Sequence, residues 1–136
     1  MDRADERAVT TGAAISELHR LAAECAQDGW DGEAGSAVDP MAVAIAEDFL
    51  RALPPGISLP ELALEPDGAL SLDWTASQHR RFTLSIGRTN RLAYAWLDGS
   101  EVGHGVANFS GATVPSRILD GLHGIMNHAC TSLRAA

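Results

Sequence analysis

The chain has 136 residues, of which 46% are hydrophobic and 21% are charged. This length and composition fit one folded domain, and no apolar run approaches the roughly 20 residues that cross a bilayer. We therefore expect neither a disordered chain nor a membrane-bound protein. The opening stretch "MDRADERAVTTG" lacks the apolar core and cleavage site of a secretory signal, so we expect a cytoplasmic protein. We predict a frayed N-terminus over residues 1–11 and a single domain over residues 12–136.

The net charge of −8 is unevenly distributed along the sequence. Residues 1–67 contain 14 acidic residues and 4 arginines, giving −10, whereas residues 68–136 contain 4 acidic residues and 6 arginines, giving +2. Binding to nucleic acid requires many cations on one surface, so we expect no direct nucleic-acid binding. Two cysteines, Cys25 and Cys130, are too few for a disulfide framework or a zinc ribbon. We assign no metal and no cofactor.

Hydrophobic periodicity predicts the elements in chain order. An apolar stripe of period 3.6 predicts a helix over 12–27, and Asp39-Pro40 before a second stripe predicts a capped helix over 40–52. Alternating segments then predict strands at 61–65, 69–74, 80–86 and 91–97, with a fifth short strand at 103–109. A last apolar stripe from Val114 to Leu133 predicts a helix. The expected fold is an α+β two-layer domain, in which helices cover an antiparallel four- or five-stranded meander in the order ααββββ(β)α.

Common catalytic signatures are absent from the sequence. It has no G-x-S-x-G elbow, no H-E-x-x-H helix and, because it has no lysine, no phosphate-binding P-loop. His123 and His128 are five residues apart, roughly 140° around a helix, and so do not share a metal-binding face. Asp98, Glu101 and His104 form the one candidate group for acid-base chemistry, but turn signals favour a structural explanation, a β-turn at Asp98-Gly99 beside an edge strand. We assign no catalytic residue.

The loop "DGWDGEAG", residues 28–35, carries the sharpest local signal. In one interpretation its glycines reverse the chain between two helices and Trp30 folds back as a hydrophobic plug. In the other, an aromatic anchor flanked by acidic side chains binds a partner with a basic surface. The candidate partner-binding residues are Asp28, Trp30, Asp31 and Glu33.

The stretch from Gly29 to Trp74 resembles a group of small bacterial proteins of unassigned function. Those proteins carry a W-D-G-x-G-A-x-P motif, a helix that ends near Pro-Pro and a D-G-x-x-x-L-x-W strand. The sequence matches this pattern at Trp30, Asp31, Gly32, Pro40, Asp67, Gly68 and Trp74, and it departs from it at Ala34-Gly35 and Ala37. The resemblance implies the fold outline and no activity.

These observations favour a non-catalytic protein-interaction module, such as the accessory or neutralising member of a bacterial two-protein system of the antitoxin, immunity or phage-related inhibitor type. Self-association is a related hypothesis, because an acidic half and an arginine-lined hairpin can pair symmetrically. The alternatives are a small enzyme that uses Asp98, Glu101 and His104, a small-molecule binder with Trp74 and Trp96 in its pocket, and an acidic mimic of nucleic acid. The mimic requires an exposed row of carboxylates from Glu17, Glu24, Glu47 and Asp48.

Overall fold

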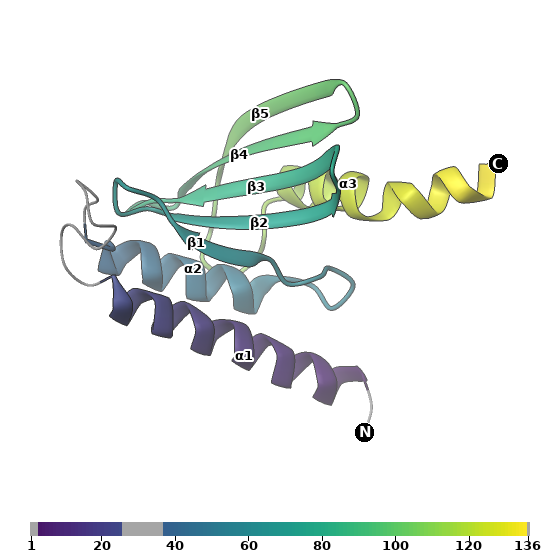
Figure 1. Cartoon of the computed structure of the whole chain (residues 1–136). Coiled ribbons are helices and arrows are strands. Elements are labelled where there is room, and N and C mark those ends of the chain that lie inside the picture. Colours follow the sequence, from purple (N-terminus) through teal and green to yellow (C-terminus); the bar gives the residue numbers. More distant parts are fainter. Residues whose placement is uncertain (1–2, 26–36, 136) are drawn as a thin grey trace.

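A computed structural model describes residues 3–25 and 37–135 of the chain, with side chains described for residues 11–25 and 37–126. Within the described residues the chain forms three helices and one five-stranded antiparallel sheet (Figure 1). In chain order these are α1 (Arg3–Glu24), α2 (Pro40–Ala52), β1 (Glu61–Leu64), β2 (Leu70–Ser77), β3 (Arg80–Ile86), β4 (Arg91–Asp98), β5 (Glu101–Asn108) and α3 (Ser116–Ala135). The predicted α+β order is confirmed, and the fifth strand is present.

The boundaries of the first two helices follow from their sequences to different degrees. α2 begins as predicted, because the Asp39 carboxylate accepts a hydrogen bond from the Met41 amide at 2.9 Å and Pro40 occupies the first helical position. By contrast, α1 begins at Arg3, well before the predicted start at Gly12. The residues before Gly12 lack an apolar stripe but include alanine, glutamate and arginine, which favour helix by intrinsic propensity.

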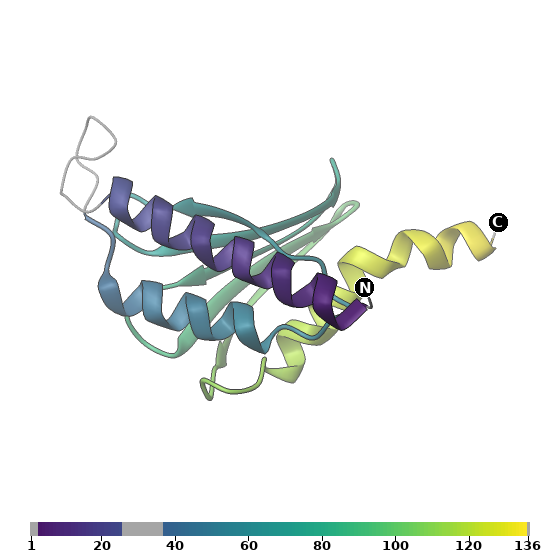
Figure 2. The same cartoon turned by 90° about the horizontal axis from the view of Figure 1, so that it is seen from below.

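The sheet is a simple meander with strand order β1-β2-β3-β4-β5. We call the face that carries Leu70, Leu72 and Trp74 the inner face, and the opposite face the outer face. Figure 2 shows α1 and α2 running side by side across one face of the sheet. Helix α3 packs against β2, β3 and β4. The helices therefore cover the inner face over β1 to β4, as the alternating strand pattern predicts for a half-covered antiparallel sheet.

The aromatic residues of the core lie at matching positions on neighbouring strands. Trp74 is the register partner of Phe82, and Phe82 is the partner of Trp96 on the next strand, so the three side chains share the inner face. Phe49 of α2 meets Trp74 edge-on with ring centroids 6.3 Å apart. This row of rings joins the helical layer to the middle of the sheet.

Candidate binding groove between the last helix and the sheet

The sequence-predicted partner residues Asp28, Trp30, Asp31 and Glu33 lie outside the described residues. Their role stays a prediction.

The candidate acid-base group does not converge. Asp98 ends β4 on the inner face, directly opposite Glu101. His104 is the register partner of Ala95, three positions from Glu101, so alternation places its side chain on the outer face. General acid-base catalysis requires the participating groups to lie within hydrogen-bond reach of one reacting centre. Asp98 and His104, on opposite faces of the sheet, do not meet that requirement.

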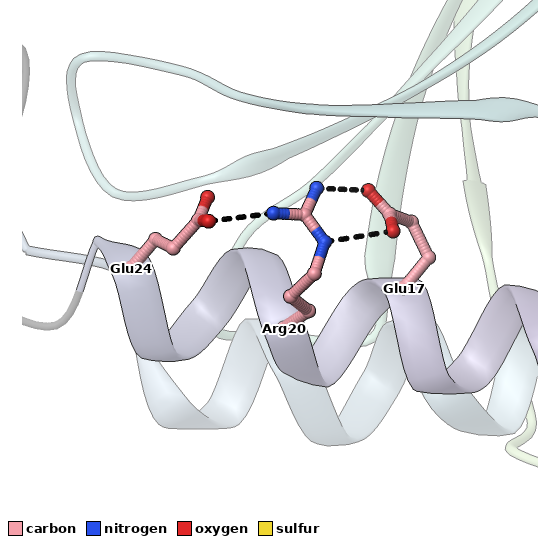
Figure 3. Close-up of polar contacts among 3 residues, drawn as sticks. All are labelled: Glu17, Arg20 and Glu24. Carbon is pink, nitrogen blue, oxygen red and sulfur yellow. Dashed lines mark hydrogen bonds and ion pairs between the residues drawn. The ribbon is translucent and has the colours of Figure 1, made fainter.

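The acidic surface of α1 contains a paired cluster rather than a free row of carboxylates. The Arg20 guanidinium binds both Glu17, one turn earlier, and Glu24, one turn later, with 2.6 Å between Arg20 Nη1 and Glu24 Oε1 (Figure 3). The hydrogen bond from Arg20 lowers the pKa of the Glu17 carboxyl, and Glu17 in turn raises the pKa of Arg20. Arg20 therefore offsets much of the negative charge at this position.

Glu47 of α2 is paired in the same way. Its Oε1 lies 2.6 Å from Nε2 of His19 on α1, and its Oε2 lies 3.1 Å from Nη1 of Arg51 on α2. Of the four carboxylates that a nucleic-acid mimic requires, Glu17, Glu24 and Glu47 thus already have cationic or imidazole partners. The arrangement disfavours the mimic.

A different feature of the molecule, a groove between α3 and β4, has the properties of a binding site. It encloses about 620 Å³. From β4 it is lined by Tyr94, Trp96 and Asp98, and from α3 by Ser116, Arg117, Asp120, Gly121, Gly124 and Ile125. This volume lies within the range of small-molecule sites, roughly 300–1,000 Å³.

Two glycines on the edge strand leave space for the two aromatic rings of the groove. Gly103 is the register partner of Trp96, and Gly105 is the register partner of Tyr94. A Cβ atom at Gly105 would come within 2.5 Å of the Tyr94 hydroxyl oxygen, and one at Gly103 would overlap the Trp96 indole. The rings therefore lie directly over the β5 backbone, where any larger residue would displace them.

Glycine on the helix shapes the opposite wall. A Cβ atom at Gly121 would lie 2.6 Å from a ring carbon of Phe82, so the helix axis approaches the sheet closely at this point. Phe82 in turn stacks on Tyr94 with centroids 5.7 Å apart and ring planes 9° apart. The core and the groove thus share the Phe82–Tyr94 stack.

Arg80 ties three elements together beside the groove. Its Nη2 donates a hydrogen bond to the Gly124 carbonyl of α3 at 3.0 Å, and its Nε lies 3.3 Å from Oδ1 of Asp98. The second contact is an ion pair without hydrogen-bond alignment, because Nε has no hydrogen-bond partner within the described residues. Arg80 therefore compensates the charge of Asp98 and fixes the helix to the sheet.

The close approach at Gly121 gives a prediction with a matched control on the same helix. Gly121→Ala is expected to lower the free energy of unfolding by about 1–3 kcal/mol, because the buried Phe82 ring blocks the added methyl group. Gly124→Ala meets no atom within 4 Å and is expected to raise it by up to about 1 kcal/mol through helix propensity. Urea unfolding monitored by circular dichroism measures both changes. Shifts of the same sign would contradict the proposed contact.

Trp74 and Trp96, predicted together as pocket residues, have separate roles. Trp96 lines the groove, whereas Trp74 is 2% exposed and belongs to the core, where its indole N–H donates to the Ser58 carbonyl at 2.7 Å. The prediction is correct for Trp96 and wrong for Trp74. Phe82 and Phe49 pack edge-on against Trp74 within the core.

A polar network occupies the outer face near β1. The Ser85 hydroxyl donates to Glu65 at 3.1 Å, and the Ser71 hydroxyl contacts both carboxylate oxygens of Asp73 at 3.2 Å. Burial raises the pKa of the Glu65 carboxyl, while the hydrogen bond from Ser85 acts in the opposite direction. Ser71 lies on this outer face and yet is only 8% exposed. We assign these contacts to local structure.

Two other kinds of feature are absent from the residues that the structure describes. In the part of the chain that the structure describes, no three His, Cys, Asp or Glu side chains gather closely enough to hold a metal ion. Within the same residues, no helix combines the length and apolar character needed to cross a bilayer.

No protein-family model, curated protein or solved structure matches this chain. The groove and the surface of the molecule are therefore the features that bear on its function.

Proposed function

We propose that the protein is a non-catalytic interaction module that binds a segment of another protein in the groove between α3 and β4. The observation that carries this proposal is the combination of half-buried Tyr94 and Trp96 with exposed Arg117 in one concave surface. Tyrosine, tryptophan and arginine are the residue types that contribute most to protein interfaces.

The charges of the groove favour an occupant with an apolar or aromatic anchor and flanking polar groups. Arg80 compensates Asp98 inside the groove, so Asp98 contributes little net charge there. Arg117 and Asp120, one turn apart on α3, supply one charge of each sign to the lining. Such a site orients a bound segment by its polar groups and gains affinity from the rings.

A blocking substitution tests the groove directly. Gly124→Leu adds a side chain to the lining at a position with no atom within 4 Å of a Cβ, and it is expected to abolish partner binding without loss of stability. His123→Leu, an exposed neighbour on α3 that is not part of the lining, is the matched control. The measurement is stoichiometric capture of a partner from native-host lysate at moderate salt, followed by titration calorimetry with the purified partner.

The acidic segment remains a separate part of the proposal. Reversing Asp28, Asp31 and Glu33 to arginine in a folded variant is expected to weaken a salt-sensitive complex if this segment contacts a basic partner. Binding that survives this change but not Gly124→Leu would assign the contact to the groove alone. The antitoxin, immunity or inhibitor class would follow from the identity of the captured partner.

Small-molecule binding in the same groove is the second candidate, favoured by the groove volume of about 620 Å³. If the wild-type protein retains no partner at all, the interaction proposal fails. The same Gly124→Leu and His123→Leu pair then serves to test ligands by thermal shift.

A further inference from the structure

Strand β5 forms a free edge of the sheet (Figure 1). A two-residue turn at Gly99 and Ser100 makes Asp98 and Glu101 a hydrogen-bonded pair. Along an antiparallel strand, residues whose backbone groups bond to the neighbouring strand alternate with residues whose backbone groups point away from it. The backbone N–H and C=O groups of Val102, His104 and Val106 therefore point away from β4. No described residue pairs with this edge.

The β5 edge lacks the features that usually prevent strands from associating. Natural edge strands are protected by proline, by lysine or other charges, or by bulges. The eight residues of β5, "EVGHGVAN", contain no proline and no lysine, and their one carboxylate, Glu101, lies at the end of the strand. Val102 and Val106 are 73% and 49% exposed on the outer face. The edge is thus an apolar template with unpaired backbone groups.

The sequence of this edge is a palindrome, Val102-Gly103-His104-Gly105-Val106. An antiparallel pair of β5 strands with a two-fold axis at His104 would set each Val102 beside the other copy's Val106, and Gly103 beside Gly105. His104 would face its own equivalent. This register also uses the outward-pointing backbone groups, because His104 is one of the residues that carry them. The fitting partner for this strand is therefore a second copy of the chain.

Charge favours the same arrangement. Because Arg80 compensates Asp98, the negative charge at the turn end of β5 comes from Glu101, whereas the other end is flanked by Arg91, the register partner of Asn108. Antiparallel pairing brings the acidic end of one copy to the basic end of the other, twice by symmetry. Within the strongly acidic part of the chain, residues 1–67, the structure describes α1, α2 and β1, and β1 lies at the opposite edge of the sheet.

From these observations we propose that two copies of the chain associate by antiparallel pairing of their β5 strands about a two-fold axis at His104, forming one continuous ten-stranded sheet. The axis is perpendicular to the sheet, so the helices and the grooves of both copies lie on the same side. This inference does not depend on the proposed occupant of the groove.

Sedimentation equilibrium of the full chain tests the proposal. The wild-type protein is expected to sediment at twice 14.3 kDa at tens of micromolar. His104→Glu would place two carboxylates face to face at the axis and is expected to weaken the dimer more than tenfold, whereas His104→Gln leaves it unchanged. Ala63→Glu, an exposed change on β1 at the opposite edge, is the control for added charge and is also expected to leave the dimer unchanged.

A second variant tests the backbone pairing itself. Val106→Pro removes an N–H that points away from β4, so the monomer retains its sheet while the dimer is lost. Circular dichroism checks the fold of this variant, and if it is unfolded the His104 pair alone decides. A wild-type protein that stays at 14.3 kDa at hundreds of micromolar overturns the proposal. A dimer that His104→Glu does not weaken overturns it as well.

Discussion

Trp74→Ala is expected to lower the free energy of unfolding by about 3–5 kcal/mol, the range for removing a fully buried aromatic side chain. The indole lies between Phe49 and Phe82, with ring centroids at 6.3 and 6.0 Å, and is 2% exposed. Alanine would leave a cavity where the helical layer meets the middle of the sheet. Because these rings are rigid and packed edge-on, neighbouring side chains cannot easily fill the space.

Two further substitutions separate the contributions at Trp74. Trp74→Phe keeps a ring in the core but loses the hydrogen bond to the Ser58 carbonyl, and it is expected to cost about 1–2 kcal/mol. Val102→Ala, at an exposed position of β5, is expected to stay within about 0.5 kcal/mol of the wild type. Urea unfolding followed by far-UV circular dichroism at one low protein concentration measures all three variants. If Trp74→Ala costs no more than Trp74→Phe, the packing argument is wrong.

The fold could be predicted because its elements are encoded by local periodicity. Alternation over Leu70, Leu72 and Trp74 identified the buried face of a strand, and Asp39-Pro40 identified the start of α2. The start of α1 was missed because residues before Gly12 form helix without an apolar stripe. Intrinsic propensity alone gave too weak a signal at this position.

The candidate groove could not be predicted in the same way, because it depends on how α3 approaches the sheet. The sequence does contain a pattern that indicates the strand side of this groove. Tyr94 and Trp96 alternate on one strand, and Gly105 and Gly103 alternate on the next at the paired positions. Register also separates Asp98 from His104. Glu101 pairs with Asp98 and shares its face, whereas His104 lies three positions from Glu101 on the same strand and therefore points to the opposite face. Comparing the two strands of each predicted pair would therefore have indicated that Tyr94 and Trp96 lie over glycines. The same comparison would have excluded Asp98 and His104 as partners in acid-base catalysis.

Gly68→Ala is expected to lower the free energy of unfolding by about 2–5 kcal/mol for two reasons. Gly68 has a φ of 90°, and a left-handed backbone conformation costs an alanine about 1–2 kcal/mol. In addition, a Cβ atom at this position would lie 2.7 Å from the Ala37 carbonyl oxygen, and forcing atoms into a packed site costs about 1–3 kcal/mol. The Gly68 carbonyl also accepts a hydrogen bond from the Asp39 amide at 3.0 Å, so a shift here disturbs the start of α2.

Gly99→Ala separates these two costs, because Gly99 also has a positive φ, 66°, but meets no atom within 4 Å of a Cβ. We expect this control to lose only the conformational part, about 1–2 kcal/mol. Chemical denaturation of both variants at neutral pH gives the difference, which reports the approach of the β1–β2 turn to the N-terminus of α2. Equal losses would show that this approach contributes nothing to stability. A larger loss at Gly68 would explain why an Asp-Gly pair stands at this turn, since only glycine accommodates both the backbone angle and the neighbouring carbonyl.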